Sequence, residues 1–169
     1  MTPRLLSYNL TPEQFEAIAS VGLDWAHADM LLGSALAKLA GITSPGDASD
    51  LIYAIDLKKK IDLIHARHKR GEVPVPAADL VSELVHVGER YRPDRNMLAH
   101  GIVLYENDGS PSMFWSQSKM KGLDIGVLDA IVSEARYTVH VASHFMGRLL
   151  GLTPPRELPP RPPERAARQ

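Results

Sequence analysis

Four polar side chains in a short stretch of the sequence have the chemistry of a phosphate site. Arg92, Asn96 and His100 are spaced four residues apart, which places them on one face of a continuous helix. Arg95 falls on an adjacent side, but its long side chain can reach the same face. Arginine holds and stabilises a phosphoryl group, histidine titrates near neutral pH and can transfer a proton, and the amide can orient the histidine or bind substrate. The stretch predicts a site for an RNA phosphodiester.

A single histidine does not easily act as both base and acid within one turnover of RNA cleavage. A two-fold homodimer would bring a second copy of the stretch around His100 to the same place and would double the local positive charge. We therefore expect a homodimer, on the ground of chemical need.

The run Arg95-Asn96-x-x-Ala99-His100-Gly101 resembles the signature of the HEPN superfamily, in which an arginine, commonly followed by a polar residue, precedes a histidine by a short spacer. Arg95 and His100 match the two signature positions, and Asn96 matches the polar one. The resemblance implies a dimeric helical bundle with a shared cleft. It also implies metal-independent endoribonuclease activity, in which the 2′-hydroxyl attacks and leaves a cyclic phosphate and a 5′-hydroxyl.

HEPN proteins often carry a second pair, an acidic residue and a lysine four positions later, on an earlier helix. Asp56 and Lys60 have this spacing, so the resemblance implies that they belong to the substrate-binding site, where Lys60 and Arg92 would hold the RNA backbone. Pairs at this spacing are also common on the solvated face of any helix. Both interpretations stay open at this point.

A nuclease of the toxin or defence type would have RNA as substrate and an antitoxin or other regulatory protein as a possible partner. Two further hypotheses compete with this one. The first is a catalytically inactive helical dimer that binds a nucleotide, an RNA or a protein. The second is a structural role, in which His100 stabilises a helix end through the dipole and Arg95 forms a solvated ion pair with Asp94 or Glu89.

Composition narrows these choices. The 169 residues carry a formal net charge of -1, with 19 basic and 20 acidic residues, so any RNA contact must come from a local cluster. The chain has no cysteine, which excludes disulfides and thiolate metal sites. We expect no metal and no other cofactor, since the histidine pairs that could bind zinc either lie in a basic run or lack a supporting motif: His65 with His68, and His140 with His144.

The elements that must position the site are mostly helical. Thr11 and Gln14 form a capping box around Pro12, and apolar residues at helical spacing follow as far as Gly41. Periodicity predicts further helices over residues 49–70, 77–91 and 124–150. Pro93 predicts a restart at Arg92-Pro93, followed by about two turns that end at Gly101.

Between the restarted helix and the last one, β-prone runs flank an Asp-Gly turn and predict a small β-hairpin over about residues 102–116. The sequence thus predicts an all-α fold, a HEPN-like bundle of four to five helices with one hairpin inserted before the last helix. It divides into an N-terminal arm (1–10), the bundle (11–151) and a disordered tail rich in proline and arginine (152–169). With no membrane span and no signal-like start, we expect a cytoplasmic protein.

Overall fold

A computed structural model describes residues 10–105, 109–115, 118–120, 123–152 and 157–163. Most of the predicted N-terminal arm therefore lies outside the described residues. The described part is mostly helical, as the sequence predicted. Its elements are, in chain order, α1 (Pro12–Leu39), α2 (Pro45–Ala54), α3 (Leu57–Lys69), α4 (Val75–Ala78), α5 (Val81–Arg90), α6 (Arg92–His100), β1 (Ile102–Tyr105), β2 (Pro111–Trp115), β3 (Ser118–Met120) and α7 (Ile125–Leu149). No described helix is long and apolar enough to cross a membrane.

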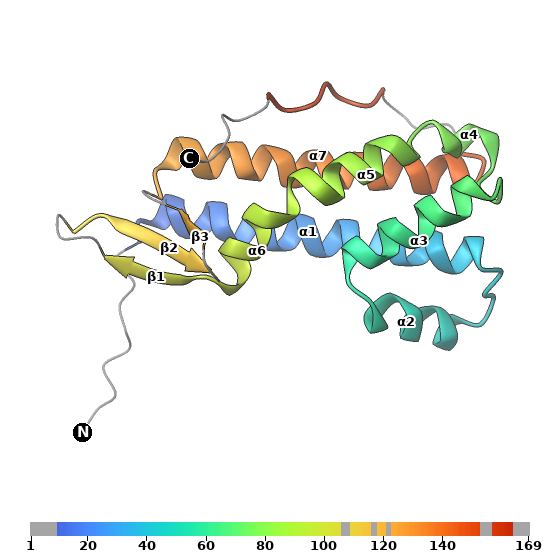
Figure 1. Cartoon of the computed structure of the whole chain (residues 1–169), viewed down its shortest axis with the longest axis horizontal. Helices are drawn as coiled ribbons and strands as arrows, with labels where there is room; N and C mark the ends of the chain where they lie inside the picture. Colours follow the sequence, from blue (N-terminus) through green and yellow to red (C-terminus); the bar gives the residue numbers. More distant parts are fainter. Residues whose placement is uncertain (1–9, 106–108, 116–117, 121–122, 153–156, 164–169) are drawn as a thin grey trace.

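The two longest helices, α1 and α7, lie side by side along the molecule (Figure 1). The predicted capping box starts α1: the Gln14 main-chain N–H donates to the Thr11 hydroxyl at 3.3 Å, and the Thr11 N–H donates to the Gln14 side chain at 2.9 Å. The Gln14 amide also donates to the carbonyl oxygen of Leu123, just before α7. The two helices therefore begin at the same end of the bundle.

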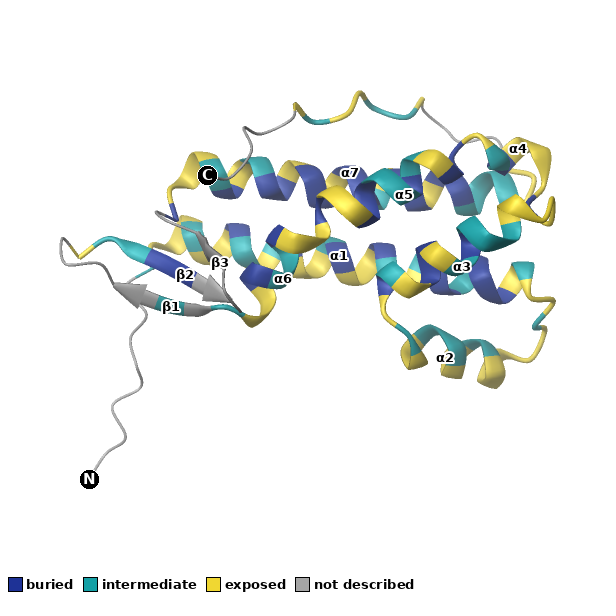
Figure 2. Ribbon diagram, viewed as in Figure 1, coloured by how far each residue is buried: buried dark blue, intermediate teal, exposed yellow. Residues whose placement is uncertain are grey.

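Buried residues recur along the helices of the bundle (Figure 2), and the apolar ones form two clusters. The larger cluster joins α1, α3, α5 and α7, and includes Trp25, Ile61, Leu84 and Phe145. The smaller one lies toward the sheet, where α6 packs on α1 and α7, and includes Val21, Met97 and Leu128. Because Met97 and Leu98 are buried, α6 is fixed to the bundle by one face and its polar residues are left on the other.

The predicted helix over residues 49–70 is wrong in one respect: it is two helices. Ile55 is extended, and Asp56 caps α3 by accepting a hydrogen bond from the Lys59 main-chain N–H at 2.8 Å. An aspartate side chain that bonds to nearby backbone competes with helix continuation and favours a helix start. As a result α2 has no fully buried residue among its ten, whereas α3 packs firmly on the bundle.

The predicted helix over residues 77–91 also divides, into the single turn α4 and the helix α5. The restart predicted at Arg92-Pro93 is confirmed, because α5 ends at Arg90 and α6 begins at Arg92 with proline in its first turn. α6 then ends at His100, and Gly101 forms its C-terminal cap. The restart gives the predicted site a short helix of its own.

A small antiparallel sheet follows α6. β1 pairs with β2 in the register Ile102 to Phe114, and β2 also pairs with a third strand, β3, which the sequence did not predict. Gly101 joins the sheet closely to α6: a Cβ atom there would lie 2.5 Å from Met113 Cγ and would also clash with the Met97 carbonyl oxygen.

Residues 157–163 of the predicted disordered tail lie along the bundle near α5 and α7 (Figure 1). Leu158 packs against the larger apolar cluster. The Arg161 guanidinium donates two hydrogen bonds to Glu83, at 2.7 and 2.5 Å, and Tyr137 donates to the same carboxylate at 3.0 Å. Burial, and then the bond to Glu83, raise the pKa of Tyr137 to about 12. These contacts order a segment whose composition alone predicted coil.

Candidate functional site

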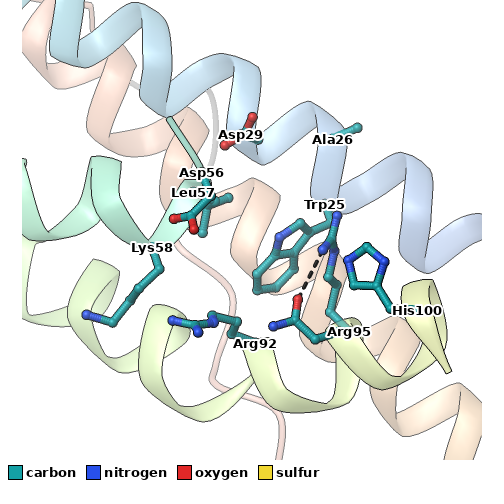
Figure 3. A pocket seen from close by; sticks show the side chains of 10 residues that line it. Trp25, Ala26, Asp29, Asp56, Leu57, Lys58, Arg92, Arg95 and His100 are labelled. Atoms are coloured by element: carbon teal, nitrogen blue, oxygen red, sulfur yellow. Dashed lines mark hydrogen bonds between the residues drawn. The ribbon is translucent and has the colours of Figure 1, made fainter. Parts of the chain in front are cut away.

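A pocket of about 380 Å³ opens between α1, the start of α3, and α6 (Figure 3). Its size is at the lower end of the range of about 300–1,000 Å³ that is usual for small-molecule sites. The lining comes from three elements far apart in the sequence: Trp25, Ala26 and Asp29 from α1, Asp56, Leu57 and Lys58 around the start of α3, and Arg92, Arg95, Asn96 and His100 from α6.

All four residues of the predicted phosphate site line this pocket. Arg92 and His100 are exposed at its mouth, whereas Arg95 and Asn96 are half-buried. They share one face of α6 because the opposite face, with Met97 and Leu98, is buried in the bundle. The structure thus brings Arg92, Arg95, Asn96 and His100 together as their spacing predicted.

Arg95 is more enclosed than Arg92, the other arginine of the pocket. Its Cζ lies 6.0 Å from the centroid of the Trp25 ring, in the range of a cation–π contact. Burial lowers the pKa of Arg95, while the charges of Asp29 and Asp56 oppose that shift. Its Nε is buried and has no hydrogen-bond partner within the described ranges. A guanidinium stays charged in proteins, and a partly dehydrated one interacts more strongly with an anion than a solvated one does.

Asn96 holds Arg95. Nη1 of Arg95 donates a hydrogen bond to Asn96 Oδ1 at 3.0 Å (dashed line in Figure 3). The sequence predicted that this amide orients the histidine or binds substrate; in the structure its oxygen also accepts a bond from the arginine. Because both residues are half-buried, the bond limits the orientations that the guanidinium can take toward the pocket.

Lys60 is in a different position from the one predicted. Its side chain is 0% exposed and does not line the pocket, so it is neither on a solvated face nor within reach of an RNA backbone. Nζ forms an ion pair with Asp29 Oδ1 at 2.7 Å and donates to the Asp29 carbonyl oxygen at 3.4 Å. The assignment of Lys60 to substrate contact is therefore wrong, because Lys60 acts behind the pocket wall.

Asp56 and Lys58 occupy the edge of the pocket at the start of α3. Asp56 lines it as predicted, but one of its oxygens is committed to the cap of α3. Lys58, two residues before Lys60, is the lysine that lines the pocket, and it forms an ion pair with Asp62 one turn later. The helix start at Asp56 sets this outcome, because it turns Lys60 inward and Lys58 toward the pocket.

Sequence reasoning did not assign five of the lining residues to the site: Trp25, Ala26, Asp29, Leu57 and Lys58. Of these, Asp29 is the carboxylate. It lies four residues after Trp25 on α1, so the two share a helix face, and this spacing was the only signal available. The ion-pair partner of Asp29, Lys60, is 31 residues away along the chain. That pairing depends on how α1 packs on α3.

The charges around the pocket favour an anion. Arg92, Arg95 and Lys58 face it with Asp29 and Asp56. Lys60 balances Asp29 from the buried side, and Asp62 pairs with Lys58. The two arginines then face the one remaining carboxylate, Asp56, so the positive charge of the lining is in excess by one. Both arginines can hold a phosphate in a bidentate manner.

The histidine pairs of the sequence, His65 with His68 and His140 with His144, lie outside the pocket lining. Nδ1 of His144 lies 2.8 Å from the carbonyl oxygen of His140, so this nitrogen donates a hydrogen bond to the helix backbone. Within the described part of the chain, no group of three or more His, Asp or Glu side chains is arranged to hold a metal ion.

Comparison with known proteins gave no matching family model, no match among curated proteins and no match among solved structures.

Proposed function

We propose that this protein is a metal-independent endoribonuclease of the HEPN type. The observation that carries the proposal is that Arg92, Arg95, Asn96 and His100 line one pocket. Arginine, amide and histidine side chains at a pocket of this size have the chemistry for binding a phosphodiester and moving a proton.

In the proposed reaction, Arg95 binds the non-bridging oxygens of the scissile phosphate and stabilises the charge that develops on them. Asn96 orients Arg95 through the 3.0 Å hydrogen bond, and Arg92 holds the backbone at the pocket mouth. His100, exposed beside Arg95, transfers a proton. Attack by the 2′-hydroxyl leaves a 2′,3′-cyclic phosphate and a 5′-hydroxyl.

We further propose that the protein acts as a homodimer through one face of α1. Phe15, Leu23 and Met30 are exposed there by 48, 73 and 49%, and helical spacing puts them on the same side as Ala26, which lines the pocket. Farther along α1, this face is covered by α2, because Gly33 allows the Ile52 side chain to pack on it. A second copy on the uncovered part would bring two pockets close together.

On the resemblance to HEPN proteins, we propose that the biological setting is a cytoplasmic toxin or defence system in which an antitoxin or another regulatory protein binds the nuclease. A regulator of this kind has to block the pocket or the α1 face beside it.

The test is RNA cleavage by purified protein in excess EDTA, with end-group analysis of the products. We expect wild type to leave cyclic phosphate ends and His100→Ala to lose about a hundredfold or more in rate, as for a general acid–base group. His140→Ala is the matched control, since His140 is exposed on α7 and is not part of the pocket lining. No cleavage of a broad RNA panel by the folded protein, or full activity in His100→Ala, would contradict the proposal and favour a binding module.

A further inference from the structure

RNA cleavage through a cyclic phosphate moves two protons. One leaves the attacking 2′-oxygen and one is given to the departing 5′-oxygen. Each copy of the chain offers only His100 among the histidines to the pocket. The second proton carrier must therefore be the His100 of a second copy or another side chain of the same pocket.

A carboxylate is available on the α1 side of the pocket. Figure 3 shows Asp29 on α1 and His100 on α6, with Trp25 and Arg95 in the region between them. The Asp29 side chain is 31% exposed, so it is open to the pocket that it lines. The arginine proposed to hold the phosphate thus lies between a carboxylate and an imidazole.

Lys60 holds the Asp29 carboxylate in place. The ion pair at 2.7 Å joins Lys60 Nζ to Asp29 Oδ1 from the buried side. The additional bond from Lys60 to the Asp29 carbonyl oxygen fixes the backbone of the same residue. The position of the carboxylate at the pocket is therefore set before substrate arrives.

We propose that Asp29 is the general base of the reaction and His100 the general acid, so that one chain holds both. The inference rests on the proposed ribonuclease function. An Asp29 oxygen takes the 2′-hydroxyl proton while O2′ bonds to phosphorus. The bond from phosphorus to O5′ breaks, and protonated His100 gives its proton to O5′. Exchange with water then restores both groups.

Asp29 fits this role better than Asp56, the other carboxylate of the pocket. Asp56 caps α3 through its 2.8 Å bond to the Lys59 N–H, and protonating it would weaken that cap. Asp29 lies in the middle of α1, where it has no capping role. Proton uptake by the Asp29 carboxylate therefore leaves the start of α3 intact.

The test compares a normal RNA dinucleotide with one whose 5′-bridging oxygen is sulfur, because a thiolate leaving group needs no general acid. On the oxygen substrate, we expect Asp29→Asn and His100→Ala each to lose about a hundredfold or more. On the sulfur substrate, His100→Ala should recover nearly the wild-type rate, and Asp29→Asn should stay slow. Asp24→Asn is the control, since Asp24 lies on α1 outside the pocket lining and pairs with Arg136 at 3.7 Å.

Asp29→Asn leaves Lys60 buried without its counter-charge, so the variant can lose its fold. The double variant Asp29→Asn/Lys60→Met removes both charges and is measured in the same way. A wild-type rate in either variant, or rescue of either by sulfur, overturns the assignment of Asp29 as base. Failure of sulfur to rescue His100→Ala also overturns it, in favour of a histidine base from the second copy. If wild type cleaves neither substrate, the proposed function falls first, and the base assignment with it.

Discussion

Lys60 Nζ on α3 lies 2.7 Å from Asp29 Oδ1 on α1, and this ion pair closes the buried side of the pocket. The lysine is completely buried and the aspartate is partly open to the pocket. A lysine is almost never fully buried without a partner. The pair therefore links the packing of the two helices to the charge of the pocket.

Asp29→Asn should lower the free energy of unfolding by about 3–5 kcal/mol, because it leaves the Lys60 ammonium buried without its counter-charge. The double variant Asp29→Asn/Lys60→Met should recover most of this loss, since replacing both members of a buried pair is often close to neutral. Urea unfolding at neutral pH measures both. Lys59→Met, at an exposed neighbouring position, should change stability by less than about 0.5 kcal/mol. Equal stability of Asp29→Asn and Lys59→Met would show that the ion pair has no net effect.

Arg95→Ala should reduce RNA cleavage by about 10²–10³-fold, as expected for the loss of a group that stabilises the developing charge. Arg95→Lys should restore only part of the rate, because an ammonium cannot form the bidentate, planar contact of a guanidinium. Single-turnover cleavage assays give these rates. Arg136→Ala, exposed on α7 and outside the pocket lining, should behave as wild type. A rate for Arg95→Lys equal to wild type would mean that charge alone suffices.

The contact of residues 157–163 with the bundle should depend on pH, because Arg161 of this segment bonds to the Glu83 carboxylate on α5. Burial opposes the shift, but the bonds from Arg161 and Tyr137 outweigh it and lower the pKa of Glu83. Because the pKa of Glu83 is lower in the folded state, its carboxylate stabilises the fold at pH values above the unfolded-state pKa of about 4.3. This stabilisation is lost as the pH falls through the folded-state pKa. The difference in unfolding midpoint between wild type and Glu83→Gln should be largest near pH 7 and should shrink below about pH 4. A difference that stays constant down to acid pH would contradict the role of the Glu83 charge.

Leu23→Glu should dissociate the proposed homodimer, because it places a charge in the middle of the exposed apolar face of α1. Sedimentation velocity over a range of protein concentrations measures the change. Val75→Glu is the matched control, since Val75 is 87% exposed at α4, away from this face. Stability within the monomer should be similar for both variants. A wild-type protein that is monomeric at all concentrations would remove the α1 face as a dimer contact.

Local sequence signals were sufficient for α6 and the residues that it presents. Pro93 predicted the helix restart, Gly101 predicted its end, and the spacing of Arg92, Asn96 and His100 predicted one face. Each of these depends on residues within two or three turns of one another, which is the range over which helical periodicity operates.

The rest of the pocket depends on contacts that no local pattern encodes. The burial of Lys60 follows from its pairing with Asp29, 31 residues away, and from the helix start at Asp56. The same spacing of Asp56 and Lys60 that suggested two surface residues instead gives a cap and a buried cation. Arg161 is a similar case, since its partner Glu83 is 78 residues away.

Gly101 gives α6 a fixed stop. Because a side chain there would collide with the Met97 carbonyl oxygen and with the Met113 side chain, even alanine at this position requires the last turn of α6 to shift. His100 belongs to that turn. A residue with no functional group of its own therefore helps to keep His100 at the pocket. Random mutagenesis scored for lost activity should find position 101 as readily as the arginine and the histidine.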